Sequence, residues 1–178
     1  MPIKLKRIFE EGNAIHEKWQ RLFLRGKLGK PSDMDKTQFF DDFGYLISFT
    51  PDAILTFGNK KLVVEIKSVN TYQFKTIKSH PSGEKQLQLY MHLTGIHEGF
   101  VLCDDKNTQD FKVFYAKYDE EKVAPFIERI EAIGELNRIF VEEKKVPKRV
   151  CESSTCKRAT QCNMKDACFN IGMGRIKL

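Results

Sequence analysis

Residues 61–70 read KLVVEIKSVN, a run of Leu, Val and Ile that carries a glutamate and a lysine two positions apart. Such a β-branched run is typical of a strand, and side chains at positions i and i+2 of a strand lie on the same face. Glu65 and Lys67 are therefore expected side by side, while Val64 and Ile66 point to the opposite face. Either the two charges form a salt-bridged solvent face, or the strand presents them at a functional edge of a sheet.

The segments around this strand predict a mixed α/β domain. Apolar residues at helical spacing predict helices at 5–25, 84–95 and 120–143. The polar stretch PSDMDKTQ carries no predicted element, and residues 68–83 are expected to form a loop. A crossover through the 84–95 helix predicts one parallel pair of strands. The predicted strands are FGYLISF, DAILTF, KLVVEIK, GFVLCD and FKVFYAKY, and Gly58-Asn59-Lys60 predicts a tight turn between the second and the third.

Composition and charge limit the classes of function. The 178-residue chain is 41% hydrophobic and 30% charged, which is typical of a globular protein with one domain and a small appendage. No apolar run approaches the roughly 18 residues of a membrane span, and the N-terminus lacks the apolar core of a signal peptide. We therefore expect a cytoplasmic protein of bacterial, archaeal or viral origin with no membrane partner. The net charge of +6, concentrated at residues 4–7, 21–30 and 144–149, suits a polyanion such as DNA.

Four of the five cysteines gather near the end of the chain, in the pattern C-x4-C-x5-C-x5-C. In a cytosolic protein such a group indicates a metal site rather than disulfides. Cys103 lies in an apolar run and is expected in the core. We expect a core over residues 1–146 and a Cys-rich metal-binding tail over residues 147–178, packed on the core. The clustered cysteines are Cys151, Cys156, Cys162 and Cys168.

A second carboxylate is expected beside Glu65. If the strands at 52–57 and 61–67 pair as a hairpin, Asp52 lies close to Glu65 and Lys67 at one edge of the sheet. Two carboxylates suit a hard divalent cation such as Mg²⁺ or Mn²⁺, and the backbone carbonyl of Ile66 can add a further oxygen ligand. A metal neutralises a scissile phosphate and lowers the pKa of bound water, while a lysine orients that water. The pattern predicts phosphodiester hydrolysis.

Two helical motifs extend this pattern. The stretch GNAIH places Gly12 and His16 one turn apart, and QLQLY does the same for Gln86 and Tyr90. Together with Asp52 and the EIK strand, these motifs resemble, in chain order, the RecB-like branch of the PD-(D/E)XK nuclease superfamily. The resemblance spans residues 9 to about 117. It implies a restriction-endonuclease-like core of a helix, a three-stranded meander with a hairpin, a helix and further strands.

The resemblance also implies the role of each site residue. Catalysis is expected from Asp52, Glu65 and Lys67. The metal ligands are expected to be His16, Asp52, Glu65 and the Ile66 carbonyl, and the DNA channel is expected to be lined by Gln86 and Tyr90. Exposed aromatics in the 68–83 loop, Tyr72 and Phe74, are candidates for stacking on bases unless they pack in the core.

Members of this branch that resemble the CRISPR-adaptation and AddB-type exonucleases hold a 4Fe–4S cluster, usually with one cysteine before the His motif and three near the chain end. Here no cysteine precedes His16. The resemblance therefore implies a 4Fe–4S cluster on the four C-terminal cysteines, Cys151, Cys156, Cys162 and Cys168. Structural Zn²⁺ on the same thiolates is the alternative, and free thiols are a third.

The expected function is that of a Mg²⁺- or Mn²⁺-dependent deoxyribonuclease, chiefly an exonuclease that acts on single-stranded DNA or DNA ends. The alternatives are a structure-specific endonuclease of repair or recombination and a catalytically silent nucleic-acid-binding adaptor. The chain has no G-x4-G-K-[ST] motif, so ATP-driven unwinding would need a helicase or recombination partner. Assembly into a homo-oligomer is also open.

Overall fold

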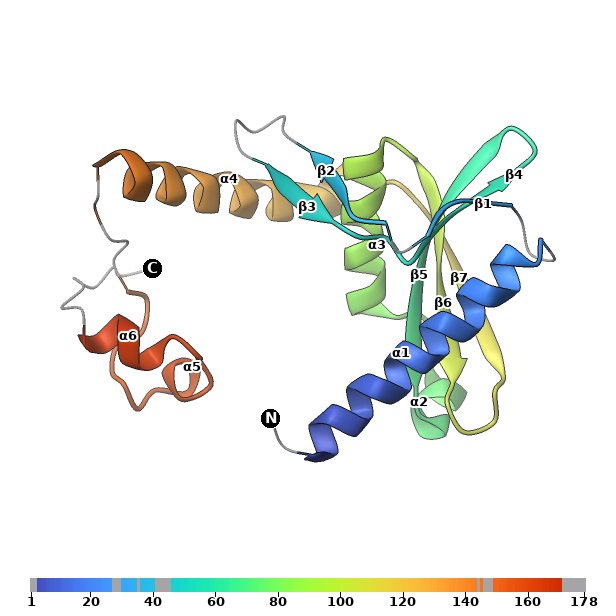
Figure 1. Cartoon of the computed structure of the whole chain (residues 1–178), viewed down its shortest axis with the longest axis horizontal. Helices are drawn as coiled ribbons and strands as arrows, with labels where there is room; N and C mark the ends of the chain where they lie inside the picture. Colours follow the sequence, from blue (N-terminus) through green and yellow to red (C-terminus); the bar gives the residue numbers. More distant parts are fainter. Residues whose placement is uncertain are drawn as a thin grey trace. The chain divides into compact units, whose positions relative to one another are not determined.

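The computed structural model describes residues 3–26, 30–34, 36–40, 46–143, 145 and 149–170 (Figure 1). Two compact units, Met1–Ile127 and Glu128–Leu178, divide the chain within the long helix α4 (Glu120–Glu143). The predicted domain boundary between residues 146 and 147 lies outside the described residues. The helix predicted at 120–143 is confirmed with those bounds.

A five-stranded mixed sheet forms the centre of the first unit (Figure 1). Its strands, in spatial order, are β1 (Lys30–Met34), β4 (Ala53–Phe57), β5 (Lys60–Val69), β6 (Glu98–Asp105) and β7 (Phe111–Lys117). All neighbours are antiparallel except β5 and β6, which are parallel because helix α3 (Pro81–Thr94) makes the crossover between them. The predicted hairpin, tight turn and parallel pair are therefore confirmed, and Gly58 supplies the positive φ of 60° at the turn.

Several elements lie where the sequence predicted none. The polar stretch after Gly29 contains β1 and β2 (Gln38–Phe40), and the expected loop at 68–83 contains the end of β5 and helix α2 (Thr71–Thr76). The strand predicted at 43–49 is described as β3 (Ile47–Phe49), which pairs with β2 in a separate two-stranded sheet, while residues 41–45 lie outside the described part. β1 is an edge strand, where Pro and charged residues are tolerated, and this explains why its composition did not suggest a strand.

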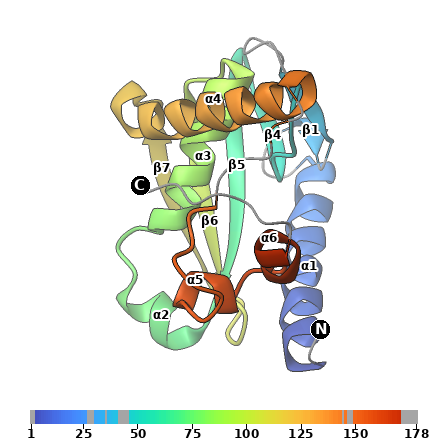
Figure 2. The same ribbon diagram turned by 90° about the vertical axis from the view of Figure 1, so that its left-hand side faces the viewer.

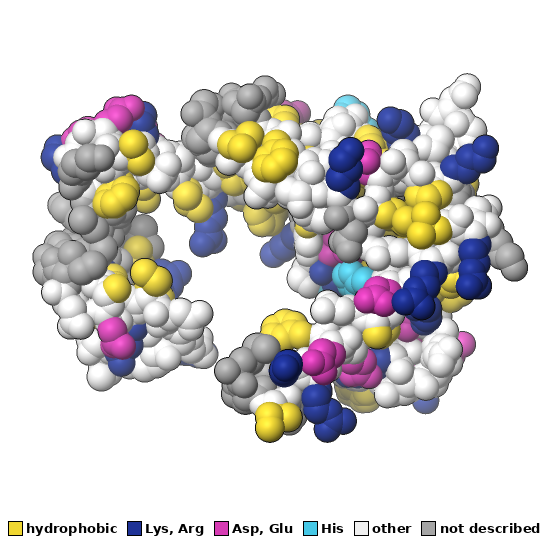
Figure 3. All heavy atoms as spheres, viewed as in Figure 1, with side chains coloured by type: hydrophobic (Ala, Val, Ile, Leu, Met, Phe, Trp, Pro, Cys, Tyr) yellow, Lys and Arg dark blue, Asp and Glu magenta, His cyan; other side chains and the backbone are white. Residues whose placement is uncertain are grey.

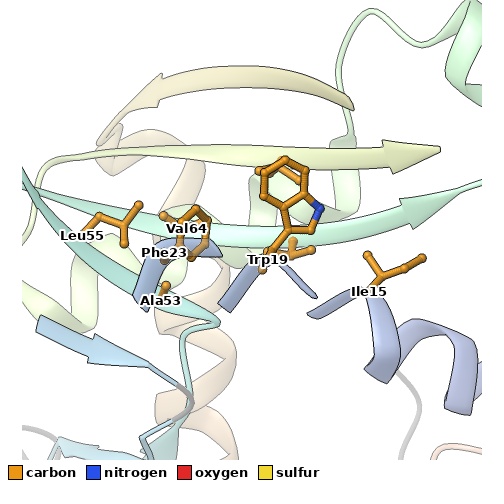
Figure 4. Close-up of a cluster of buried hydrophobic side chains, with 8 residues drawn as sticks. Ile15, Trp19, Phe23, Ala53, Leu55 and Val64 are labelled. Carbon is orange, nitrogen blue, oxygen red and sulfur yellow. The ribbon is translucent and has the colours of Figure 1, made fainter. Parts of the chain in front are cut away.

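The two faces of the large sheet are covered by different helices (Figure 2). Helix α1 (Ile3–Leu24) packs on one face, where its buried residues meet alternate residues of β4 and β5 (Figure 4). Helix α3 packs on the other face. The α1 cluster consists of Ile15, Trp19, Phe23, Ala53, Leu55, Val64, Ile66 and Leu102, and the α3 cluster of Val63, Val69, Leu87, Met91, Val101 and Cys103.

This alternation decides where the charges of β5 lie. Val64 and Ile66 are fully buried under α1, and each such side chain contributes about 1.5–3 kcal/mol of burial free energy. A register slip by one residue would turn both of them to the α3 face and place Glu65 and Lys67 under the apolar face of α1. Glu65 and Lys67 are therefore fixed on the α3 face, together with Val63.

The second unit holds the rest of α4 and two short helices, α5 (Lys157–Thr160) and α6 (Lys165–Asn170). The guanidinium of Arg149 lies 4.6 Å from the centre of the Phe169 ring, which links the segment after α4 to α6. No helix in the described ranges of the chain combines the length and the apolar character needed to cross a membrane.

Candidate active site

Strand pairing brings two carboxylates together. β4 and β5 pair with Ala53 opposite Val64, so Asp52, one residue before β4, lies beside Glu65. Asp52 Oδ2 accepts a hydrogen bond from the backbone N–H of Ile66, with 2.6 Å between N and O. Asp52 is 9% exposed and Glu65 is 1% exposed. Two adjacent buried carboxylates repel each other, so this arrangement needs positive charge nearby.

A chain of polar contacts links β5 to α3. Lys67 Nζ lies 2.5 Å from Glu65 Oε1 and donates a hydrogen bond to Gln86 Oε1 at 3.0 Å. Gln86 Nε2 in turn donates to the hydroxyl of Tyr90 at 2.9 Å. Gln86 and Tyr90 can do this because residues four apart share one face of a helix. The structure thus places Glu65, Lys67, Gln86 and Tyr90 in one continuous chain of contacts.

Helix α1 contributes His16 to the same edge of the sheet. His16 Nδ1 lies 3.0 Å from Asp52 Oδ1, and this hydrogen bond raises the pKa of His16 despite the opposing effect of burial. One turn further on, Gln20 Nε2 donates to the Asp52 carbonyl oxygen at 3.3 Å, a contact that the sequence did not suggest. A Cβ at Gly12 would meet nothing within 4 Å, so the described surroundings do not require glycine there.

Glu65 is held in an unfavourable environment for a charge. Burial, followed by the charge of Asp52, raises the pKa of Glu65 from 4.5 to about 7, outweighing the opposite effects of Lys67 and His16. Its Oε2 atom is buried without a hydrogen-bond partner among the described residues. A buried polar atom left unpaired costs on the order of 1–3 kcal/mol. Such an oxygen is suited to bind a cation.

The donor set fits a hard divalent cation. Carboxylates, an imidazole and a backbone carbonyl are ligands that Mg²⁺ or Mn²⁺ accepts. As placed, both oxygens of Asp52 already accept contacts, one from His16 and one from Ile66 N–H. Among the described residues, no three His, Cys, Asp or Glu side chains converge closely enough to hold one ion. Metal binding would therefore replace the His16–Asp52 contact.

Two residues that the sequence analysis did not single out lie beside Lys67. His80 is the N-cap of α3, and its Nδ1 accepts a hydrogen bond from the Gly83 N–H at 3.1 Å. A Cβ at Gly83 would lie 2.9 Å from Val101 Cγ1 and 3.2 Å from Lys67 Cγ, so only glycine fits there without a shift of its neighbours. Burial and the charge of Lys67 lower the pKa of His80. Pro81 at the first helical position was the available sequence signal for this helix start.

A further buried carboxylate anchors α1 to the sheet. Asp104, which is 1% exposed, accepts a hydrogen bond at Oδ2 from Trp19 Nε1 at 2.7 Å and pairs with the ammonium of Lys18. Its Oδ1 has no partner among the described residues. Because Lys18 and Trp19 follow His16 closely on α1, this contact also helps to hold His16 at the candidate site. The sequence signal was only an Asp at the end of a predicted strand.

Basic side chains along α1 alternate with acidic ones on the face of the molecule shown in Figure 3. Arg7 and Arg25 are exposed, but so are Glu10 and Glu17, and Glu17 pairs with Arg21 at 3.0 Å. The predicted basic segment at 21–30 lies in part outside the described residues. α1 therefore presents mixed charge rather than a uniform basic stripe.

One of the two aromatic candidates for base stacking is exposed. Tyr72, on α2, is 80% exposed. Phe74 packs against the α3 cluster instead, and the Lys112 ammonium lies 4.6 Å from the centre of its ring. This packing removes Phe74 as a stacking candidate.

The cysteines of the second unit are partly gathered. Burial first, then the neighbouring thiol of Cys156 and, to a smaller extent, Cys162 raise the pKa of Cys151. Backbone N–H groups, first that of Ala159, lower the pKa of Cys156. Cys168 lies on α6, where its N–H bonds the Met164 carbonyl at 2.8 Å. None of the five cysteines, all of which lie in the described part of the chain, forms a disulfide, and Cys103 is buried in the core, where burial raises its pKa to about 11.

Comparison with known proteins identifies relatives by structure alone. No protein-family model matches the chain, and no curated protein matches it. The structure of LHK-Exo in complex with dAMP has a TM-score of 0.56 and 18% identity, with 76% of this chain and 72% of that chain covered. A second structure of LHK-Exo, an alkaline exonuclease from Laribacter hongkongensis, has a TM-score of 0.50 and 20% identity. This match covers 76% of this chain and 75% of that chain.

A third solved structure, that of SSO0001, has a TM-score of 0.48 and 17% identity, with 86% of this chain and 69% of that chain covered. At these identities the likeness to LHK-Exo concerns the fold. The mixed α/β architecture found here is consistent with the restriction-endonuclease-like core expected from the sequence, and it is shared with an alkaline exonuclease.

Proposed function

We propose that this chain is a divalent-metal-dependent deoxyribonuclease. The observation that carries the proposal is the group formed by Asp52, Glu65 and Lys67, in which a buried carboxylate oxygen of Glu65 has no partner among the described residues. The fold shared with an alkaline exonuclease supports the same reading. Because one fold can host many activities, the proposal rests on the residues of the site.

The proposed ligands are Asp52, Glu65, the Ile66 carbonyl and His16. A divalent cation bound there would neutralise charge on a phosphodiester and lower the pKa of a bound water. Deprotonated Glu65 is the form that binds it, so cation binding and ionisation of Glu65 are coupled. We propose either Mg²⁺ or Mn²⁺ as the ion.

Lys67 would act on the nucleophile and the phosphate. Its ammonium is held between Glu65 and Gln86, which restricts the long side chain before substrate arrives. An ammonium so placed donates hydrogen bonds to an attacking water and stabilises negative charge that develops on the phosphate oxygens. Tyr90 fixes Gln86 from the far side, so α3 positions the lysine through two side chains.

We propose DNA ends or single strands as the substrate, with exonuclease action preferred over the structure-specific endonuclease. The fold shared with an alkaline exonuclease supports this preference. Exposed Tyr72 on α2 is available to stack on a base, a contact that is worth about 1–3 kcal/mol per base in single-strand binding.

The test uses end-labelled linear DNA and circular DNA of the same sequence, with Mg²⁺ or Mn²⁺. Wild type should degrade the linear substrate only, and Lys67→Ala should reduce the rate by about 10²-fold or more. Lys61→Ala is the matched control, because Lys61 is an exposed lysine on the same strand. Cleavage of circular DNA would favour the endonuclease. Binding without cleavage under either metal would favour the catalytically silent adaptor.

We further propose that the C-terminal cysteines hold a metal centre, either a 4Fe–4S cluster or Zn²⁺. The proposal rests on the spacing of the four cysteines and on the lowered pKa of Cys156, which favours the thiolate that ligates metal. Absorbance near about 400 nm in anaerobically purified protein would identify the cluster. A colourless protein with one bound zinc would identify the alternative. Cys156→Ser should lose the metal, whereas Cys103→Ser should keep it.

A further inference from the structure

Two side chains of α1 contact Asp52, and they contact different parts of it. His16 Nδ1 lies 3.0 Å from the carboxylate oxygen Oδ1. Gln20, which is half-buried and lies one helical turn further along, donates from Nε2 to the backbone carbonyl oxygen of Asp52 at 3.3 Å. Because residues four apart share one face of a helix, both side chains reach Asp52 from the same side of α1. Gln20 therefore ties α1 to the backbone of a proposed metal ligand.

The two contacts differ in what metal binding does to them. The carboxylate of Asp52 and the imidazole of His16 are both proposed ligands, so a bound cation replaces the direct contact between them. The carbonyl oxygen of Asp52 is not a proposed ligand, and its hydrogen bond from Gln20 does not compete with the cation. This second contact can therefore persist and hold α1 beside Asp52 when the first one is lost.

His16 needs such a restraint because it is the proposed ligand that comes from α1. The other proposed ligands come from the β4–β5 hairpin and the residue before it, where backbone pairing fixes the register. The apolar side chains of α1 pack without a preferred direction, whereas a hydrogen bond is directional. Metal–ligand distances vary by only about 0.2 Å, so a small rotation of α1 would withdraw the imidazole. The buried apolar side chains of α1 are Ile15, Trp19 and Phe23.

A second polar anchor of α1 lies away from the proposed metal ligands. Trp19 Nε1 donates to Asp104 on β6 at 2.7 Å, which fixes the helix on the sheet but does not contact Asp52. Gln20 makes its contact at Asp52 itself, one turn from His16. The hydrogen bond from Gln20 is thus the one placed to set the distance between the imidazole and the carboxylate.

We propose that Gln20 is a positioning residue, which holds α1 against the Asp52 carbonyl so that His16 stays within reach of the cation. This inference rests on the proposed nuclease function, because it names a residue that supports the proposed metal site. Gln20 itself is assigned no contact with the metal or with DNA.

The test measures the Kd of Mn²⁺ by isothermal titration calorimetry in wild type and in Gln20→Met. Methionine has a similar length and flexibility but cannot donate a hydrogen bond. The Kd should rise about tenfold, because removing a group that orients a metal ligand typically costs about 10–100-fold in affinity. An unchanged Kd would overturn the proposal.

Asn13→Met is the matched control. Asn13 is an exposed amide of α1, one turn before His16, so the variant makes the same exchange of an amide for a thioether on the same helix. Its Kd should match that of wild type within about twofold, as expected for an exposed position. An equal rise in both variants would assign the effect to α1 as a whole and contradict the role of Gln20. Cooperative thermal unfolding in EDTA verifies that both variants fold.

A double-mutant cycle separates positioning of His16 from a general loosening of the site. In the His16→Ala background the imidazole is absent, so Gln20→Met should change the Kd of Mn²⁺ by less than about twofold. A tenfold change that persisted in this background would show that Gln20 does not act through His16, and the proposal would fail.

The outcomes also separate this inference from the proposed function. If wild type binds Mn²⁺ but cleaves no DNA, the nuclease proposal fails, and the Kd values still decide the role of Gln20. If wild type cleaves DNA and Gln20→Met binds Mn²⁺ equally well, the nuclease proposal stands and the role of Gln20 is refuted. If wild type binds no Mn²⁺, both are wrong.

Discussion

Replacing Glu65 by Gln should stabilise the metal-free protein and abolish the proposed nuclease activity. Burial and the charge of Asp52 raise the pKa of Glu65 from 4.5 to about 7, so the folded state disfavours ionisation of this carboxyl. The unfolded chain ionises it at the ordinary value. The stability that the protonated carboxyl contributes is therefore fully present below pH 4.5 and is lost as the pH rises through about 7.

The size of the effect follows from the two pKa values. Each pKa unit corresponds to about 1.36 kcal/mol, so ionising Glu65 in the folded state costs on the order of 3 kcal/mol at alkaline pH. Gln has nearly the same shape and never ionises. Above about pH 8, the unfolding free energy of Glu65→Gln should exceed that of wild type by about 3 kcal/mol. For a chain of this size, this corresponds to a rise of about 6–12 °C in Tm. The unfolding free energies of the two proteins should converge as the pH falls below 4.5, where Glu65 becomes protonated in the unfolded state as well as in the folded state.

The assay is urea unfolding in the presence of EDTA over a pH series. Trp19 is the single tryptophan and is 4% exposed, so its fluorescence reports the packing of α1 on the sheet. Replacing EDTA with Mn²⁺ at alkaline pH should stabilise wild type but not Glu65→Gln, because a ligand that binds only the folded state raises its stability. Glu10→Gln, at an exposed carboxyl of α1, is the control and should follow wild type. If the unfolding free energies of wild type and Glu65→Gln changed with pH in parallel, the raised pKa of Glu65 would be refuted.

Three further predictions concern packing and thiol chemistry. Gly83→Ala should lower the unfolding free energy by about 1–3 kcal/mol, since its Cβ would lie 2.9 Å from Val101 Cγ1. A Cβ at Gly12 would meet nothing within 4 Å, so Gly12→Ala should stabilise α1 by up to about 1 kcal/mol. Equal effects of the two variants in urea unfolding would contradict this. Asp104→Ala should cost about 1–3 kcal/mol, because it leaves the buried Trp19 N–H without its acceptor and removes the partner of Lys18, whose side chain is 35% exposed. No loss by the same measurement would contradict this. In metal-free protein near neutral pH, Cys156 should react with maleimide first, because its pKa is lowered. Cys103, whose pKa is raised by burial, should react only after unfolding. Early labelling of Cys103, detected by mass spectrometry of the labelled peptides, would contradict this.

Local sequence patterns predicted much of the fold. The alternation of KLVVEIK fixed which side chains of β5 share a face, and the turn at Gly58 fixed the antiparallel hairpin that sets Asp52 beside Glu65. Helical periodicity predicted α1, α3 and α4, and α3 then required the parallel β5–β6 pair. These features were predictable because each depends on periodicity, turn chemistry or chain connectivity over a few residues.

Other elements were not predictable from local pattern. β1 is polar because it lies at the sheet edge, and α2 is a single short helix fixed by the cap at Asn70. Phe74 was a candidate for stacking on DNA, but its burial depends on the neighbouring β6–β7 region. In each case the composition resembled that of a loop, and only the surrounding structure decided otherwise.

By itself, the sequence determined the strand that carries Glu65 and Lys67 and the order of the elements around it. Tertiary structure alone decided the anchoring of α1 through Lys18, Trp19 and Asp104, whose partners lie 85 and 86 positions apart in the chain. It also decided that a side chain at Gly83 would meet both His80 and Lys67, and that Glu65 Oε2 has no hydrogen-bond partner among the described residues. The reason is physical: periodicity is imposed by backbone geometry over a few residues, whereas burial and charge pairing depend on residues that folding brings together from distant parts of the chain.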